Sequence, residues 1–281
     1  MNGAVGLGPY LERLYERYSR LEYLVSDPLQ FIHRYDDKVD REVVGFLSAG
    51  LAFGRVSSIL GSLERALAPL GDAPAARLRE MSPKDCEVAA DGFVHRWVFA
   101  PDLANIFKAL GGVLRAWGDL EAPFMAGIEP GHEDLRHGSH ALVTALWGEL
   151  PESARKRRGT RYLLPQALGG SACKRLHLFL RWMVRTEDVD LGLWRDVKPS
   201  QLLIPVDTHV ARIATYLGLT RRKVAGCSMV LEITDHLRAL DPSDPVKYDF
   251  ALSRLGILGS CQRRRDVSLC RTCELLPVCQ L

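Results

Sequence analysis

Four cysteines lie within a short C-terminal stretch of the chain, at Cys261, Cys270, Cys273 and Cys279, with the spacing C-x8-C-x2-C-x5-C. The C-x-x-C pair at Cys270 and Cys273 lets two thiolates reach one metal centre, and the two outer cysteines complete a set of four ligands. Four thiolates are the ligands of a 4Fe-4S cluster. The spacing therefore predicts such a cluster as the cofactor.

Structural zinc is the alternative cofactor for the same four thiolates, although zinc ribbons usually contain two C-x-x-C pairs and this stretch has one. Disulfides would require an oxidising compartment, and the first residues, MNGAVGLGPYLERLYERY, lack the basic start, apolar core and cleavage site of a signal peptide. The other cysteines, Cys86, Cys173 and Cys227, are isolated in the sequence and are expected to be small buried residues.

A second residue that could take part in a reaction is Lys174, at the start of a predicted helix in the segment SACKRLHLFLRWMVR. Helical spacing places the apolar residues on one side and Lys174, Arg181 and Arg185 on the other, so we expect a solvated cationic face. Free backbone N–H groups at a helix start favour an anion such as a DNA phosphate. The positive potential also favours a neutral, nucleophilic amine at Lys174. A surface lysine without catalytic function is the alternative.

Asp207 directly precedes a predicted helix in the segment LLIPVDTHVARIATYLGL. Such a residue is an ordinary N-cap that accepts hydrogen bonds from first-turn amides. An ionised carboxylate at a helix start could also stabilise an oxocarbenium-like sugar while an N-glycosidic bond breaks, or activate the attacking group. The residues alone leave both roles open.

The elements that must position these groups are helices. Strand-type alternation is nowhere sustained, and an all-α fold is predicted. Asp244-Pro245 and Pro101-Asp102 are predicted to open helices, and the stretch 118–170 is predicted to be an irregular insertion with one helix near Ala141–Leu146. Apolar residues recur at helical spacing in the segments 8–24, 41–52, 102–117, 138–149, 172–185, 207–218, 228–240 and 245–258.

The composition is that of a globular protein, with 281 residues, 47% hydrophobic and 25% charged residues, and no apolar run long enough to cross a bilayer. The formal net charge is only +3. Basic residues nevertheless cluster at 155–158, 221–223 and 263–265, and the last cluster lies inside the cysteine run. Three such clusters indicate a nucleic-acid backbone as partner.

The glycine-preceded lysine helix, the V-D-T-H-V-A-R helix start and the four-cysteine loop together resemble the helix-hairpin-helix DNA glycosylase superfamily, which includes endonuclease III and the adenine glycosylases. Within it, the segments REVVGFLSAGLAFGRVSSIL, FVHRW and DPVKYDFALSRLGI look most like an uncharacterised bacterial family related to archaeal 8-oxoguanine DNA glycosylases. The resemblance covers the chain from about residue 30 onward. Two spacings differ: the first cysteine gap is two residues longer, and Asp207 follows Lys174 by thirty-three residues, as in the elongated archaeal hairpin.

The resemblance implies a catalytic pair, with Lys174 attacking the sugar C1′ and Asp207 as its acidic partner. If Lys174 has no such role, a monofunctional enzyme that uses water remains. The extruded base needs aromatic, apolar and hydrogen-bonding contacts, and the segment 51–55 is the expected source of the residue that fills the gap in the duplex. The expected contacts to base or DNA are Phe93, His95, Arg96, Trp97, Arg181, Trp182, His209, Tyr248, Asp249 and Arg264.

The implied architecture is two all-α domains, with residues 31–199 in one and residues 1–30 plus 200–281 in the other. The cluster loop, 261–281, is expected to order Arg263, Arg264, Arg265 and Arg271 against phosphates. The implied protein is a cytoplasmic, nucleoid-associated bacterial monomer that removes an oxidised, 8-oxoguanine-like base from DNA and has lysine-dependent β-lyase activity. It is expected to need no small-molecule cofactor other than the cluster and to have no membrane as partner. A catalytically silent DNA-binding protein and a zinc-stabilised helical module are the alternatives.

Overall fold

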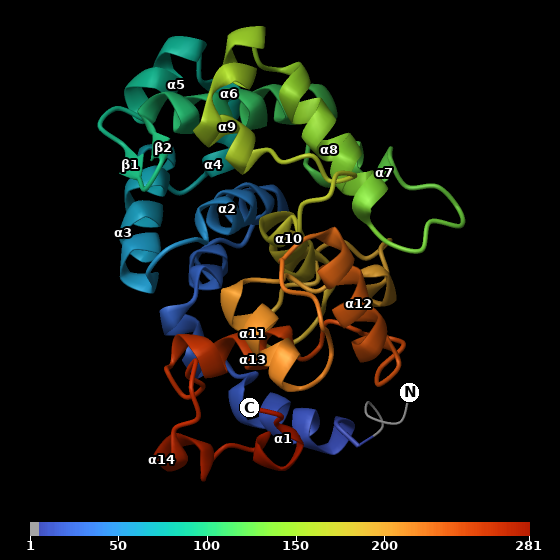
Figure 1. Cartoon of the computed structure of the whole chain (residues 1–281). Helices are drawn as coiled ribbons and strands as arrows, with labels where there is room; N and C mark the ends of the chain where they lie inside the picture. Colours follow the sequence, from blue (N-terminus) through green and yellow to red (C-terminus); the bar gives the residue numbers. More distant parts are fainter. Residues whose placement is uncertain (1–5) are drawn as a thin grey trace. The chain divides into compact units, whose positions relative to one another are not determined.

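A computed structural model describes residues 6–281 and is mostly helical (Figure 1). The chain divides into two compact units, one formed by Leu24–Leu168 and the other by Met1–Tyr23 together with Gly169–Leu281. We call them the middle unit and the terminal unit. The all-α prediction is confirmed at the level of helical content, since the strands of the described part are limited to one two-stranded hairpin.

The middle unit is built around α6, whose residues from Leu103 to Leu114 are nearly all buried. Helices α4, α5, α8 and α9 pack around it, as expected for a helix that is apolar on most of its circumference. The bounds are α2 (Lys38–Leu51), α3 (Val56–Leu67), α4 (Pro74–Glu80), α5 (Pro83–Ala89), β1 (Val94–His95), β2 (Val98–Phe99), α6 (Ala100–Trp117), α7 (Glu121–Met125), α8 (Arg136–Gly148) and α9 (Arg158–Leu163).

In the terminal unit, α13 packs against both α1 and α11, and α10 is buried from Leu176 to Val184. The bounds are α1 (Gly8–Tyr18), α10 (Lys174–Val184), α11 (Thr208–Tyr216), α12 (Cys227–Arg238), α13 (Asp249–Ile257) and α14 (Val267–Cys270). Short 3-10 turns complete the chain at Leu21–Ser26, Pro28–Arg34, Ala68–Leu70, Glu152–Lys156, Pro199–Gln201 and Leu276–Val278.

Each helix predicted from periodicity is present, and most of the predicted ends lie within three residues of the observed ends. Two other expectations need correction. Asp244 does not cap a helix at Pro245, because α13 begins at Asp249 and the Asp244 carboxylate pairs with Arg185 at 2.8 Å. The stretch 118–170 also contains α7 and α9 in addition to α8. These helices of five and six residues are too short to produce a periodic signal.

The division of the chain differs from the predicted domains 31–199 and 1–30 plus 200–281, because α10 lies in the terminal unit. A backbone bridge joins Ser171 to Gly226, and the amide of Cys227 donates to Gly170 O at 3.0 Å. The lysine helix is therefore part of the same compact unit as Asp207. Across the described residues, none of the helices combines the length and apolar character needed to span a membrane.

Candidate active site

Lys174 is the first residue of α10 and follows a residue with unusual backbone geometry. Cys173 is buried and adopts a left-handed conformation with φ 43°, which costs free energy for a residue other than glycine. The backbone therefore changes direction at the residue directly before α10. The Lys174 side chain remains 28% exposed, so its amine is accessible.

Asp207 is the N-cap of α11, as the sequence predicts. One carboxylate oxygen, Oδ1, accepts hydrogen bonds from the amides of His209 and Val210, both at 2.8 Å. These two bonds satisfy first-turn donors and fix the orientation of the carboxylate. Val210, Ile213 and Ala214 anchor the helix in the core. The capping bonds therefore leave Oδ2 available for a second partner.

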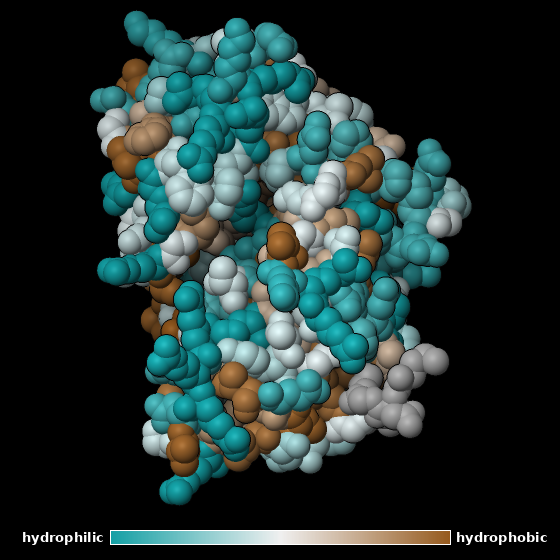
Figure 2. All heavy atoms as spheres, in the orientation of Figure 1, coloured by the Kyte–Doolittle hydropathy of each residue, from teal (hydrophilic) through white to brown (hydrophobic). Residues whose placement is uncertain are grey.

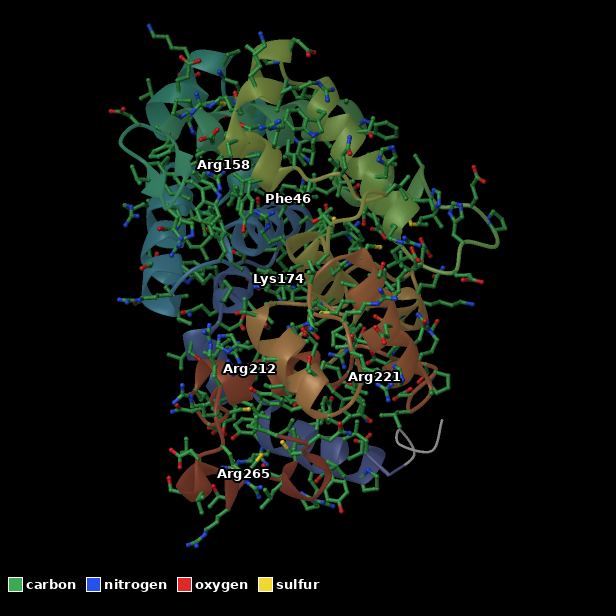
Figure 3. All side chains as sticks on the ribbon, in the orientation of Figure 1. Phe46, Arg158, Lys174, Arg212, Arg221 and Arg265 are labelled. Carbon is green, nitrogen blue, oxygen red and sulfur yellow. The ribbon has the colours of Figure 1, made fainter. Side chains whose placement is uncertain are left out.

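That second partner is Lys174, whose Nζ lies 4.0 Å from Asp207 Oδ2 (Figure 3 labels Lys174). The two residues are thirty-three positions apart in the sequence, and each stands at the first turn of its own helix. Both side chains are partly exposed, at 28% and 20%. An amine beside a carboxylate, both reachable from solvent, is an arrangement suited to nucleophilic catalysis with an acid–base partner.

The predicted solvated cationic face of α10 is wrong beyond Lys174. Arg181 and Arg185 are only 2% and 1% exposed. Arg181 pairs with Asp190 at 3.2 Å and with Asp249 at 2.5 Å, and Arg185 pairs with Asp190 at 2.5 Å. Buried charges are tolerated only when they are paired in this way. Arg181 therefore positions elements of the terminal unit, and its predicted contact with DNA is corrected.

Asp249 is likewise a buried residue of the ion-pair network, with 2% exposure, and does not offer a surface contact to DNA. Burial raises the pKa of its carboxyl to about 6, opposed by Arg181 and assisted by the negative charge of Asp207. Asp249 therefore interacts electrostatically with the Asp207 carboxylate.

His209 packs against α13 through a glycine. A Cβ at Gly256 would lie 2.2 Å from His209 Nδ1, so only glycine permits this approach. Nδ1 is buried and accepts or donates no hydrogen bond among the described residues. The ring therefore joins α11 to α13 by close packing, beside the Asp207 cap. The predicted contact of His209 with DNA stays a prediction.

Three other predicted contacts are buried side chains of the cores. Trp182 is fully buried in α10, Phe93 is 4% exposed, and Tyr248 is 2% exposed. Tyr248 donates to Glu12 at 2.5 Å, and burial raises the pKa of its hydroxyl. We correct the prediction that these residues contact a base directly: their large apolar surfaces are used for packing.

The predicted pocket residues of the middle unit separate into one buried and two accessible side chains. His95 is 2% exposed, and its ring nitrogens contact Ser62 Oγ and the carbonyl of Phe53, both at 2.9 Å. Burial lowers the pKa of His95. Its predicted contact with a base is therefore corrected to a structural role. Arg96 is exposed and Trp97 is half-buried, so both are accessible.

The four C-terminal cysteines are all half-buried, in a loop that includes α14. Burial raises the pKa of Cys261 and of Cys273, and each of these thiols is also influenced by Cys270. Cys279 in turn influences Cys261. The thiols of this loop therefore influence one another electrostatically.

The separation of the thiols bears on which group they could hold. Tetrahedral zinc with Zn–S bonds of about 2.3 Å would draw the sulfurs within roughly 4 Å of one another. In the described residues, no three cysteine sulfurs lie within 4.8 Å of one another. In a four-iron cluster each thiolate binds a different iron, so the sulfurs stand at the corners of a larger tetrahedron. The four-iron cluster and its zinc alternative therefore both stay predictions from the sequence.

The basic segments named from the sequence are mostly exposed. Arg264 and its neighbours Arg263 and Arg265 are all exposed, and hydrophilic side chains with some hydrophobic ones among them lie around α14 (Figure 2). The segments 155–158 and 221–223 are exposed except for Arg157, which pairs with Asp102 at 2.8 Å. Figure 3 labels one member of each cluster, Arg158, Arg221 and Arg265.

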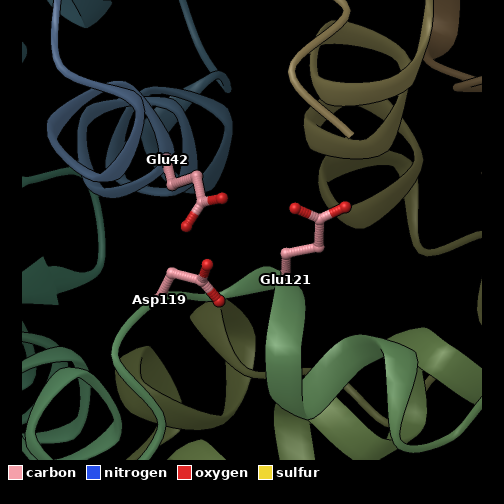
Figure 4. A group of neighbouring side chains, drawn as sticks. All are labelled: Glu42, Asp119 and Glu121. Atoms are coloured by element: carbon pink, nitrogen blue, oxygen red, sulfur yellow. The ribbon is translucent and has the colours of Figure 1, made fainter. Parts of the chain in front are cut away.

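One carboxylate cluster had no signal in the sequence because Glu42 is far along the chain from Asp119 and Glu121. Oxygens of Glu42, Asp119 and Glu121 lie within 4.8 Å of one another in the middle unit (Figure 4). Lys38 supplies the cation at this cluster, with its Nζ 2.5 Å from Glu121 and 3.2 Å from Asp119. Glu42 also accepts the amide of Leu120 at 2.8 Å. The cluster therefore joins α2 to α7 as a structural ion-pair network.

Comparison with known proteins gives one positive match. The family model described as "Protein of unknown function (DUF2400)" matches residues 27–258 of the chain. The match includes Lys174 and Asp207 and ends just before Cys261. No curated protein matches the chain, and no solved structure matches it.

Proposed function

The chain belongs to the DUF2400 family of proteins of unknown function, and we propose that it is a DNA glycosylase that removes a damaged base and cleaves the resulting site. The observation that carries this proposal is the 4.0 Å separation of Lys174 Nζ and Asp207 Oδ2 at two helix starts of one unit. The sequence resemblance to helix-hairpin-helix glycosylases names the same two residues. The distance between the two side chains and the sequence resemblance therefore support the same pair, Lys174 and Asp207.

In the proposed reaction Lys174 acts as the nucleophile and Asp207 as its acid–base partner. The ammonium first loses a proton, for which Asp207 Oδ2 is the adjacent carboxylate oxygen. The free amine attacks the sugar C1′, and the C1′–N bond breaks, so that the base leaves with the electron pair and is protonated. The ring then opens to a protonated Schiff base between Lys174 and C1′. Loss of a C2′ proton expels the 3′ phosphate, which is the β-lyase step.

The proposed substrate is DNA with an oxidised base, and 8-oxoguanine is the first choice on family resemblance. Exposed basic segments at 155–158, 221–223 and 263–265 support a phosphate-backbone partner. The helix start of α10, which has no side-chain cap, also offers backbone N–H groups where phosphates bind well. The base preference itself is to be measured.

We further propose that Cys261, Cys270, Cys273 and Cys279 hold a 4Fe-4S cluster. When bound, the cluster would cross-link the loop and order its arginines. Arg212 supports this loop by donating to the carbonyl of Cys261 at 2.8 Å. The residues of the chain, and not the cluster, carry the bond cleavage in this proposal.

The test is base release from duplex and single-stranded oligonucleotides that each contain one oxidised, deaminated or alkylated base. The wild-type protein should release one class of base, and Asp207→Asn should release it roughly a hundredfold or more slowly while binding the same DNA. Equal rates for wild type and Asp207→Asn would contradict the assignment of the site. Binding of DNA without release of any base would favour the catalytically silent DNA-binding protein.

A further inference from the structure

An aromatic cluster in the middle unit, apart from the Lys174–Asp207 pair, is built from three half-buried rings. Phe53 stacks on Trp97 with ring centroids 5.1 Å apart and an interplanar angle of 29°. Tyr162 meets both rings edge-on, at 4.8 Å and 5.1 Å. All three side chains are partly exposed. We call Phe53, Trp97 and Tyr162 the aromatic platform.

Two arginines lie over this platform. The guanidinium carbon of Arg96 is 5.2 Å from the Trp97 ring centroid, and that of Arg158 is 5.4 Å from it. Both residues are exposed (Figure 3 labels Arg158). Within residues 6–281, neither guanidinium forms an ion pair with a carboxylate. Two like charges therefore share one indole ring without an acid between them.

The platform is held by a buried frame. His95 ties the carbonyl of Phe53 to Ser62, and Asp102 accepts the amide of Thr160 at 3.0 Å, which fixes the first turn of α9 and hence Arg158. A Cβ at Gly159 would lie 2.4 Å from Asp102 Oδ2, so this contact requires glycine.

Arg96 is held by a second, unusual constraint. Its φ is 55°, a strained value for an arginine. Gly54, with φ of +107°, lies beneath it: a Cβ there would be 3.1 Å from Arg96 Cδ. Backbone strain is thus retained at a position that places a guanidinium over Trp97. The indole Nε1 of Trp97 is buried and has no hydrogen-bond partner in the described part of the chain.

The chemistry of the site selects one class of ligand. Aromatic cages that bind ammonium groups rely on attraction of a cation to the rings, and two guanidinium groups would repel such a ligand. A ligand that combines a flat π-surface with negative charge satisfies both features, because it stacks on the rings and neutralises the arginines. Unpaired nucleotides combine these properties, and single-strand binding proteins use aromatic rings with basic residues for them.

We propose that the aromatic platform with Arg96 and Arg158 binds an unpaired nucleobase of single-stranded DNA and its adjacent phosphates. This inference rests on the proposed function for its choice of DNA, but it does not depend on the Lys174–Asp207 pair. On binding, a base replaces a guanidinium over Trp97, and the displaced arginine pairs with a phosphate.

The test is binding of an oligothymidylate about twelve nucleotides long, of an abasic strand of the same length, and of thymidine 5′-monophosphate. The wild-type protein should bind the oligothymidylate about tenfold or more tightly than the abasic strand. Trp97→Ala should remove that difference. Trp97→Phe keeps an aromatic surface and should retain it, while losing the fluorescence quenching caused by a base on Trp97. Trp117→Ala, at an exposed tryptophan of the same unit, is the matched control.

Arg96→Gly provides a variant that does not threaten folding, because glycine is at ease at positive φ. It should weaken binding of both strands and reduce the salt dependence of affinity by about one charge. Equal affinity of wild type for thymidylate and abasic strands, or of Trp97→Ala and wild type for thymidylate, would overturn the proposal. Monophosphate binding as tight as strand binding would also overturn it. Base preference in binding without any base release would contradict the glycosylase and leave the platform standing.

Discussion

The two carboxylate oxygens of Asp207 have different partners: Oδ1 accepts the amides of His209 and Val210, and Oδ2 lies 4.0 Å from Nζ of Lys174. The capping function and the proposed chemical function therefore use different oxygen atoms of one residue. An ordinary helix cap would need only the first set of bonds. This division allows structure and chemistry to be separated by choice of substitution.

Asp207→Asn should keep the cap, since an amide oxygen also accepts first-turn N–H bonds, and should change the free energy of unfolding by less than about 0.5 kcal/mol. Asp207→Ala should cost about 1 kcal/mol. Both should lower base release by roughly a hundredfold or more. Asp37→Asn is the control, because Asp37 caps α2 in the same way and its neighbour Lys38 pairs instead with Asp119 and Glu121. Full activity of Asp207→Asn would mean that Asp207 is a cap alone.

The ionisation of Asp249 should make stability depend on pH. Its folded-state pKa of about 6 lies above the ordinary value of 3.8, so the folded protein holds this proton more tightly than the unfolded chain. This contribution to the free energy of unfolding is present at about pH 4 and is lost as the pH rises through 6. The total loss is on the order of 3 kcal/mol. Urea unfolding of wild type and Asp249→Asn from pH 4 to 7 measures it. If the free energy of unfolding changes with pH in the same way in the two proteins, Asp249 does not have the raised pKa.

Gly256→Ala should destabilise the contact between α11 and α13. The added methyl group would lie 2.2 Å from His209 Nδ1, and overpacking of this kind costs about 1–3 kcal/mol. Thermal unfolding should therefore occur at a lower temperature. Gly8→Ala is the matched control, since the nearest atom to its Cβ would be 4.0 Å away. If both variants melt with the wild type, the close packing of His209 does not contribute to stability.

Cys270→Ser should remove the iron and acid-labile sulfide of the purified protein, with loss of solubility and DNA binding together. Cys227 lies outside the C-terminal loop, so Cys227→Ser should leave the iron and sulfide content, the solubility and the DNA binding unchanged. Metal analysis and DNA binding of the two variants provide the comparison. Iron-free wild-type protein with stoichiometric zinc would instead favour a zinc-stabilised module.

The sequence was most informative about features that depend on local spacing. Periodicity located the long helices, such as 102–117 at α6, and the cap at Asp207 followed from its position before an apolar helix. The lysine and the aspartate were named, but their separation of 4.0 Å depends on how α10 and α11 pack. No local pattern encodes that packing.

The errors also have a physical cause. Arg181 and Arg185 look like surface residues because arginine usually stays in water, yet Asp190 and Asp249 pair with Arg181 inside the unit. Those partners come from other segments, so helical spacing could not reveal them. The Phe53–Trp97–Tyr162 contacts likewise unite three segments of the middle unit.

Borohydride trapping tests the central claim most directly, with wild type, Lys174→Ala and Lys198→Ala each incubated with oligonucleotides that carry single lesions. Lys198 is an exposed lysine of the same unit and serves as the control. We predict a covalent protein–DNA adduct on one lesion for wild type and Lys198→Ala, and no adduct for Lys174→Ala. An adduct that persists in Lys174→Ala would show that another amine is the nucleophile and would contradict the account.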